Sequence, residues 1–175
     1  MRVIFFIFFA VCSPVHTVQC PAFEKTCILV EKQYQSLSND NSSSNQIRYL
    51  NSFPIDYKGF VHCFGYKIHN YHKNVSFGCL YDNYVNYINK LFILNKIDKR
   101  LLYKKIMTVT YNAYYQDDAC GFLQDRILEL IKNDKEFVLF LKLDRNKSKQ
   151  IYHFIMLNKQ ENIELNAFLS NKILK

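Results

Sequence analysis

Histidine and cysteine gather in one stretch of the chain. His62, Cys63, His69 and His72 stand close together, and imidazole nitrogen and thiolate sulfur are ligands that Zn²⁺ prefers. Their spacing matches no metal-binding signature, and Cys63 has a competing use in a disulfide. We therefore expect these histidines to be exposed or capping residues, and we assign no metal site.

Two further features have a catalytic interpretation. A cysteine with a distant histidine can act as a thiol nucleophile, and the pair Asp117-Asp118 has the composition of an acid–base couple. Structural disulfides explain the cysteines better, and N-capping explains the aspartates better because a helical stripe follows them. The chain has no GxSxG, no HExxH and no glycine-rich phosphate loop. We expect no enzyme activity, no catalytic residue and no cofactor.

The amino terminus has the three parts of a cleavable signal peptide. The charge of Arg2 is followed by an apolar run over residues 3–11 and then by small or helix-breaking residues. This run is far shorter than the roughly 20 residues that a spanning helix needs, and no later apolar segment is longer. We predict a signal peptide over residues 1–17, a single secreted, extracellular domain over residues 18–175, and no membrane span.

Five cysteines remain whether cleavage follows Cys12 or Thr17. In an oxidising compartment they should mostly pair, and their odd number leaves one that is free or bonded to another chain. Sequence alone does not choose among the pairings, and Cys20, near the new amino terminus, is the expected odd one. The five are Cys20, Cys27, Cys63, Cys79 and Cys120.

Three N-glycosylation sequons support the predicted secretion of the protein. They begin at Asn41, Asn74 and Asn146, and each falls in a polar stretch that we interpret as a loop. We therefore expect a glycoprotein.

Composition favours a helical fold. The 175 residues include only four Gly and three Pro, whereas an all-β sandwich needs many tight turns. The net charge is +8, but the basic residues are scattered and form no stripe with interleaved aromatics, so we expect no nucleic-acid partner. The prediction is an all-α, small, disulfide-linked single domain.

The clearest periodicity lies in the middle of the chain. Apolar residues recur at helical spacing and predict helices near residues 80–94, 98–115 and 118–132. Asp98 suits the N-cap of the second. The aromatic-rich inner stripes of these helices would ordinarily form a core, but a helical domain clamped by disulfides can also enclose an apolar cavity. The predicted cavity is lined by Tyr84, Ile88, Leu91, Leu102, Ile106, Leu123 and Ile127.

The flanking regions are less regular. Residues 23–35 and 47–53 suit short helices on either side of a polar, flexible loop over residues 37–46. Asp56 is a plausible N-cap for a helix that carries Cys63 and reaches Ile68.

The carboxy-terminal third leaves two alternatives open. Residues 136–143 and 151–157 flank a charged segment and fit either two short helices or a β-hairpin. We favour the helices. Residues 163–173 suit a terminal amphipathic helix.

Three stretches resemble the insect odorant-binding and pheromone-binding proteins, a family that includes related salivary carriers of biting flies. They are residues 53–64, with Phe53-Pro54-Ile55-Asp56 and Cys63; residues 90–102; and residues 117–120, with Cys120. The resemblance implies a secreted helical domain with a hydrophobic ligand cavity and the disulfides Cys27–Cys79 and Cys63–Cys120. The chain departs from the family in two ways. Cys79 follows Cys63 by sixteen positions, where the family has only a few, and two family cysteines have no counterpart.

Two functions follow as expectations. The first is a secreted carrier of a small hydrophobic molecule, similar to the odorant-binding proteins. The second is a secreted effector that binds another extracellular protein through a basic, tyrosine-rich surface. The sequence does not decide the oligomeric state.

Overall fold

The computed structural model describes residues 24–69, 74–114, 118–157, 159 and 161–175. The predicted signal peptide and Cys20 lie outside these residues. The helices are α1 (Glu24–Asn39), α2 (Ser43–Ser52), α3 (Tyr57–Phe64), α4 (Tyr84–Phe92), α5 (Lys99–Thr110), α6 (Asp118–Asn133), α7 (Lys135–Lys142), α8 (Arg145–Met156) and α9 (Ile163–Leu169). A 3₁₀ turn, η1 (Tyr81–Asn83), precedes α4, and a π-helical turn, η2 (Ser170–Leu174), follows α9.

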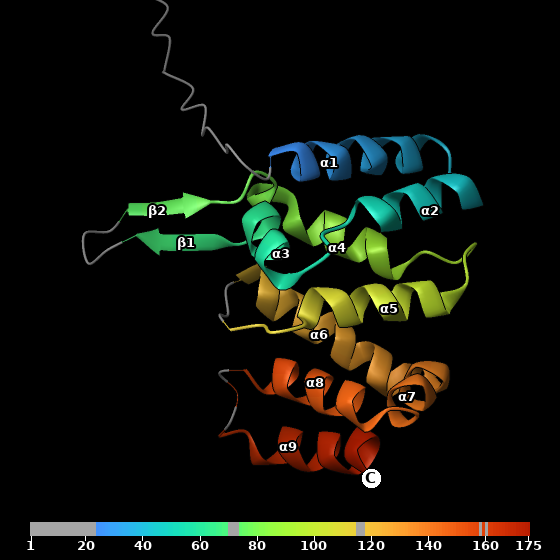
Figure 1. The fold of residues 1–175 in the computed structure, drawn as a ribbon, viewed down its shortest axis with the longest axis vertical. Helices are drawn as coiled ribbons and strands as arrows, with labels where there is room; N and C mark the ends of the chain where they lie inside the picture. Colours follow the sequence, from blue (N-terminus) through green and yellow to red (C-terminus); the bar gives the residue numbers. More distant parts are fainter. Residues whose placement is uncertain (1–23, 70–73, 115–117, 158, 160) are drawn as a thin grey trace, which may run out of the picture.

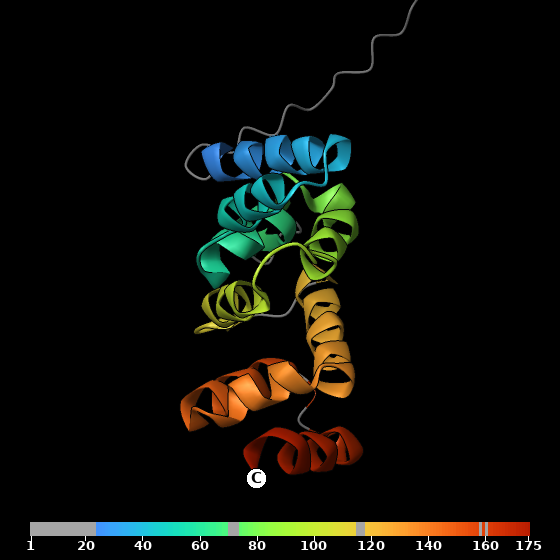
Figure 2. The same cartoon turned by 90° about the vertical axis from the view of Figure 1, so that its right-hand side faces the viewer.

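The all-α prediction is confirmed, with one small β-hairpin beside the helices. Figure 1 shows the helices following one another along the long axis of the molecule, from α1 at one end to α9 at the other. Helix α6 runs along that axis (Figure 2) and packs against α4, α7 and α8, so it joins the two ends. None of the helices in the described part of the chain has the length and apolar character to cross a membrane.

Short polar side chains begin most of the helices, as their types predict. The Asp56 carboxylate accepts from the Gly59 N–H at 2.7 Å, and the Asp98 carboxylate accepts from the Arg100 N–H at 2.9 Å. The three helices predicted in the middle of the chain are present. Two of them are shorter than expected, because α4 runs only from Tyr84 to Phe92 and α5 stops at Thr110, whereas α6 spans the predicted residues and ends at Asn133.

The flexible loop predicted over residues 37–46 is wrong. Helix α1 continues to Asn39 and α2 begins at Ser43, with Ser42 as its N-cap. The polar residues are used as partners for one another. The Asn45 amide donates to the carboxylate of Asp40 at 2.9 Å, and the Gln46 amide donates to the side chain of Asn41 at 2.8 Å.

The helix predicted to reach Ile68 ends at Phe64. The Gly65 N–H donates to the Val61 carbonyl and closes α3. The chain then enters an antiparallel hairpin of β1 (Tyr66–His69) and β2 (Asn74–Phe77), with Tyr66 paired to Phe77. Their rings lie 6.2 Å apart, a cross-strand aromatic contact that stabilises such a pair.

The carboxy-terminal third is helical, so the hairpin alternative over residues 136–157 is wrong. Asp134 caps α7 and Asp144 caps α8 through their carboxylates. These two caps explain why short apolar runs with strong strand propensity fold as helices. Residues 163–173 form α9 and η2, of which Leu169 and Ile173 are buried.

One continuous core runs through the molecule. Its amino-terminal part is an aromatic cluster in which Phe53 stacks on Phe64 at 5.2 Å between ring centroids. The buried Tyr49 hydroxyl donates to the Tyr87 carbonyl at 2.6 Å and ties α2 to α4. These contacts join the amino-terminal helices, and α6 packs against both α4 and α8 and so continues the core to the other end.

Candidate ligand-binding cleft

The seven residues predicted to line a cavity lie together in the core. Six are buried, and Tyr84 is half-buried and packs against the same cluster. None of the seven lines either of the two pockets that are described below. The sequence therefore identified an inward-facing set correctly, whereas its role as a cavity lining stays a prediction.

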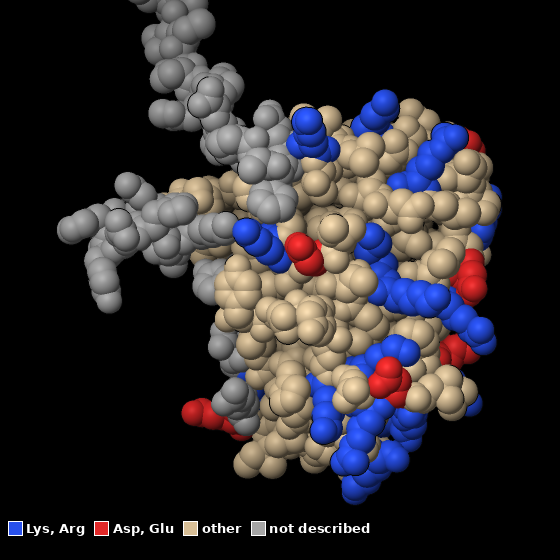
Figure 3. Space-filling model, viewed as in Figure 1, with Lys and Arg blue, Asp and Glu red and all other residues tan. Residues whose placement is uncertain are grey.

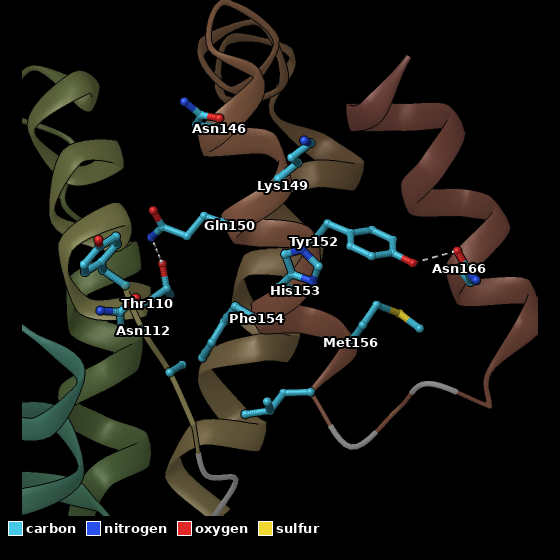
Figure 4. A pocket seen from close by; sticks show the side chains of 13 residues that line it. Thr110, Asn112, Asn146, Lys149, Gln150, Tyr152, His153, Phe154, Met156 and Asn166 are labelled. Atoms are coloured by element: carbon cyan, nitrogen blue, oxygen red, sulfur yellow. Dashed lines mark hydrogen bonds between the residues drawn. The ribbon is translucent and has the colours of Figure 1, made fainter.

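A pocket of about 760 Å³ lies instead over α8, and we call it the α8 cleft. Helix α8 forms its floor, the end of α5 stands on one side and α9 on the other (Figure 4). Its volume falls within the range of sites that hold small molecules. The lining residues are Thr110, Tyr111, Asn112, Ala113, Asn146, Lys149, Gln150, Tyr152, His153, Phe154, Met156, Leu157 and Asn166.

The amphipathic pattern of α8 creates the floor. Ser148, Ile151 and Ile155 are buried against the rest of the core. Lys149 and His153 are exposed, and their spacing of four residues places them on one face of the helix. The cleft therefore lies on the polar face of a helix whose other face is in the core.

The α5 wall is fastened to the floor by hydrogen bonds. The Gln150 amide of α8 donates to the Thr110 hydroxyl at 2.9 Å and to the Met107 carbonyl at 2.5 Å. Just beyond α5, Asn112 has φ 53°, a left-handed conformation that asparagine tolerates better than most residues. This turn brings residues 111–113 over the edge of the cleft.

The α9 wall is fastened in the same way. The Tyr152 hydroxyl donates to the side-chain oxygen of Asn166 at 3.0 Å (Figure 4). That oxygen also accepts from the Ser170 hydroxyl at 3.1 Å. Apolar contact surface is supplied by Phe154, Met156 and Leu157. The cleft therefore has fixed walls, one cationic group and an apolar side.

The charge of the cleft is one-sided. The thirteen described residues that line it include Lys149 and no aspartate or glutamate. Helix α8 also carries Arg145 and Lys147. Figure 3 shows lysine and arginine side chains over much of this face, including the end of the molecule that holds α8 and α9. Such a surface attracts anionic ligands.

A second, smaller pocket of about 320 Å³ lies between the start of α1 and residues 51–56. Three large apolar side chains are exposed on α1 and in residues 51–56. Ile55 is 75% exposed, Ile28 is 55% exposed and Leu29 is 46% exposed. Leu29 and Ile55 line the pocket itself, so this end of the molecule presents apolar surface to solvent.

Three of the cysteines meet where α1, α3 and the hairpin exit come together. The Cys27 thiol is hydrogen-bonded to the thiols of Cys63 and Cys79. The bond to Cys63, and then burial, raise the pKa of Cys27 far above the ordinary thiol value. Cys27 and Cys63 are buried and Cys79 is exposed. Cys120 is buried in the first turn of α6, which packs against α3.

This arrangement bears on several sequence-based expectations. Cys27 and Cys79 are neighbours, while the disulfides Cys27–Cys79 and Cys63–Cys120 stay predictions. The described residues hold no group of three or more His, Cys, Asp or Glu side chains placed to bind a metal ion. Of the clustered histidines, His62 is half-buried on α3, and His72 lies outside the described residues.

The sequons are not all in loops. Asn41 lies in the connection between α1 and α2, as expected. Asn74 begins β2, and the exposed Asn146 lies in the first turn of α8 rather than in a loop. Asp118 begins α6 and its carboxylate accepts from the Tyr81 hydroxyl at 2.7 Å, a bond that raises the pKa of Tyr81 to about 12. Asp117 lies outside the described residues.

No protein-family model, curated protein or solved structure matches the chain. The case for function therefore rests on the geometry. Sequence reasoning missed the α8 cleft because it left residues 136–157 undecided between helix and hairpin. The spacing of Asn146, Lys149 and His153 is the signal that a helical assignment would have made visible.

Proposed function

We propose that the protein binds and carries a small amphipathic molecule with an anionic group in the α8 cleft. The observation that carries the proposal is the one-sided lining, in which Lys149 faces no described acidic partner and apolar side chains stand beside it. The ligand class agrees with the apolar-carrier function that the resemblance to odorant-binding proteins implies, and the anionic group is what the cleft adds to it.

The lining suggests how the ligand is held. Its anionic group would lie at Lys149, where a charge-assisted hydrogen bond is stronger than a neutral one. Its apolar part would lie against Phe154, Met156 and Leu157, and burial there contributes about 25 cal/mol per Å² of apolar surface. The exposed Tyr111, on the α5 side of the cleft, would orient the ligand through its hydroxyl.

Displacement of a fluorescent probe tests the proposal. An apolar, anionic naphthalene sulfonate dye should bind the folded protein, and decanoic acid should displace it at lower concentration than decanol does. The acid has the same chain as the alcohol and adds only the charge. Equal potency of the two, or no dye binding, would contradict an anionic ligand.

A pair of lysine variants locates the site. Lys149→Gln should weaken decanoate binding about tenfold, which is the loss of one charge-assisted bond of roughly 1.4 kcal/mol. The matched control is Lys32→Gln, because Lys32 is exposed on α1 at the other end of the molecule. Equal loss in both variants would show that net charge, rather than the cleft, attracts the ligand.

A protein-binding effector is the second candidate, and the exposed apolar residues around the smaller pocket favour it. Substituting Ile28 and Ile55 by serine would leave decanoate binding unchanged but would abolish binding to a protein partner. A survey of extracellular proteins retained by immobilised wild-type chain and lost with this variant would establish the second function.

A further inference from the structure

Cys27 is the shared neighbour of two other thiols. Its side chain is hydrogen-bonded both to Cys63 and to Cys79. Cys27 is 1% exposed and Cys63 is fully buried, whereas Cys79 reaches solvent. Cys27 is therefore a buried thiol with one buried neighbour, Cys63, and one exposed neighbour, Cys79.

The backbone fixes this cluster. After the hairpin, the Gly78 N–H donates to the Gly65 carbonyl and the Leu80 N–H donates to the Cys63 carbonyl, both at 2.8 Å. A Cβ at Gly78 would lie 2.6 Å from the Cys63 carbonyl. The hairpin exit is thus pressed onto the end of α3, and Cys79 is held beside the buried pair.

We propose that Cys27 takes part in two alternative disulfides, a buried one with Cys63 and a surface one with Cys79, and that thiol–disulfide exchange interconverts them. The first joins α1 to α3, and the second joins α1 to the hairpin exit. The family resemblance implies only the Cys27–Cys79 pair and joins Cys63 to Cys120. A Cys27 that alternates between two partners follows from the structure and not from the resemblance.

The chemistry balances without further partners once the first disulfide exists. Oxidised glutathione forms a mixed disulfide with the exposed Cys79 thiolate and releases one glutathione thiolate. The Cys27 thiolate then attacks the Cys79 sulfur, the second glutathione leaves as a thiolate, and the Cys27–Cys79 disulfide forms. The Cys63 thiolate attacks the Cys27 sulfur, the Cys27–Cys79 bond breaks, and Cys79 leaves as a thiolate that takes up a proton. The reverse attack by Cys79 restores the first bond.

Peptide mapping of the whole protein tests the exchange directly. The chain is oxidised in glutathione buffer, quenched with acid and an alkylating agent, freed of N-glycans and digested with trypsin. Trypsin places each cysteine of the cluster on its own peptide: residues 26–32 for Cys27, 59–67 for Cys63 and 74–90 for Cys79. The wild type should yield both cross-linked pairs that contain residues 26–32.

Two features distinguish exchange from a mixture formed at folding. The ratio of the two pairs should not change with the ratio of oxidised to reduced glutathione, because both isomers have the same oxidation state. The rate of re-equilibration should rise about tenfold per pH unit below the pKa of the attacking thiol. A ratio that follows the glutathione poise, or a rate independent of pH, would overturn the proposal.

Variants keep the test informative if one of them folds poorly. Cys79→Ser should leave only the Cys27–Cys63 pair, and Cys63→Ala should leave only the Cys27–Cys79 pair. Alanine is used at position 63 because that side chain is buried, and circular dichroism checks helix content in both. A wild type with only one of the two pairs, or with Cys63 joined to Cys120, would overturn the proposal.

Discussion

The core between α4, α5 and α6 and the α8 cleft are built from the same kind of helix. In the core, α4 packs against α6, α5 packs against α3, α7 and α8, and Ile88, Ile106 and Ile127 are at most 1% exposed. At the cleft, α8 turns its apolar face to that core and leaves a polar face between two walls. Amphipathic spacing thus tells which residues face inward, whereas the number of neighbouring helices decides whether a space is filled.

The largest effect should come from the core. Ile127→Ala is expected to destabilise the protein by about 3 kcal/mol, since a fully buried isoleucine loses its apolar contacts and leaves a void that close-packed neighbours fill only partly. Urea denaturation followed by circular dichroism measures the change.

The matched control is Ile163→Ala. Ile163 is 82% exposed at the start of α9. This substitution should therefore change the free energy of unfolding of the protein by less than about 0.5 kcal/mol. If Ile127→Ala also changed the free energy of unfolding by less than about 0.5 kcal/mol, the prediction that Ile127 is closely packed would be wrong.

A smaller loss is expected at Asp134, which caps α7 and bonds to α5. The side chain of Asp134 is 15% exposed, and one of its oxygens accepts from the N–H groups of Glu136 and Phe137. Its other oxygen accepts from the Tyr103 hydroxyl at 3.0 Å and from the Lys99 ammonium group at 3.3 Å. Asp134→Ala should cost about 2 kcal/mol, because a cap and two side-chain bonds are lost together.

The pH dependence gives the same residue a second test. Burial alone would raise the pKa of Asp134, but the bonds from the Phe137 N–H, Tyr103 and Lys99 outweigh it and lower the pKa. A depressed pKa in the folded state means that the stabilisation is present above about pH 4 and is lost as pH falls through the folded pKa. The acid limb of the stability curve should flatten in Asp134→Ala. It should persist in Asp144→Ala, whose carboxylate caps α8 while its side chain is 41% exposed.

The helix starts that sequence predicted well carry an aspartate N-cap. Near residues 98–110, an aspartate cap and an apolar stripe agree, and α5 begins where Asp98 places it. Near residues 57–64, the Asp56 cap alone located the start of α3. Helix starts could therefore be predicted from local sequence, because the donor and the acceptor of each cap bond are at most three residues apart.

Errors arose where distant contacts decide. Gln46 is fully buried in a segment that looked like a loop, and its side-chain amide oxygen accepts from the Lys96 N–H at 2.8 Å, fifty positions away. The hairpin after α3 is held by backbone bonds from Gly78 and Leu80. The cleft likewise depends on the Gln150 bond to Thr110 across forty positions. Such pairs leave no periodic trace in a single sequence.

The turn at the edge of the cleft tests its wall. Asn112→Ala should destabilise the protein by about 1 kcal/mol, because alanine occupies the left-handed region less readily than asparagine does. Asn112→Gly should match or slightly exceed the wild-type stability, since glycine adopts φ 53° without steric cost. Thermal unfolding of the two variants side by side gives the comparison, and equal losses would show that the asparagine side chain, rather than its backbone angle, holds the turn.

The smallest effect is expected inside the cleft itself. Tyr152→Phe removes the hydroxyl that donates to Asn166, but the Asn166 oxygen keeps its bond from Ser170, so no buried acceptor is left without a partner. The cost should be about 0.5 kcal/mol, at the low end for a hydrogen bond.

The exposed Tyr111 makes the matched control, and Tyr111→Phe should leave stability unchanged. The two variants differ in what they do to the site, because only Tyr152→Phe removes the side-chain hydrogen bond between α8 and α9. Decanoate affinity should therefore fall more in Tyr152→Phe than in Tyr111→Phe if α9 is a wall of the binding site. The opposite order would place the ligand against the α5 side alone.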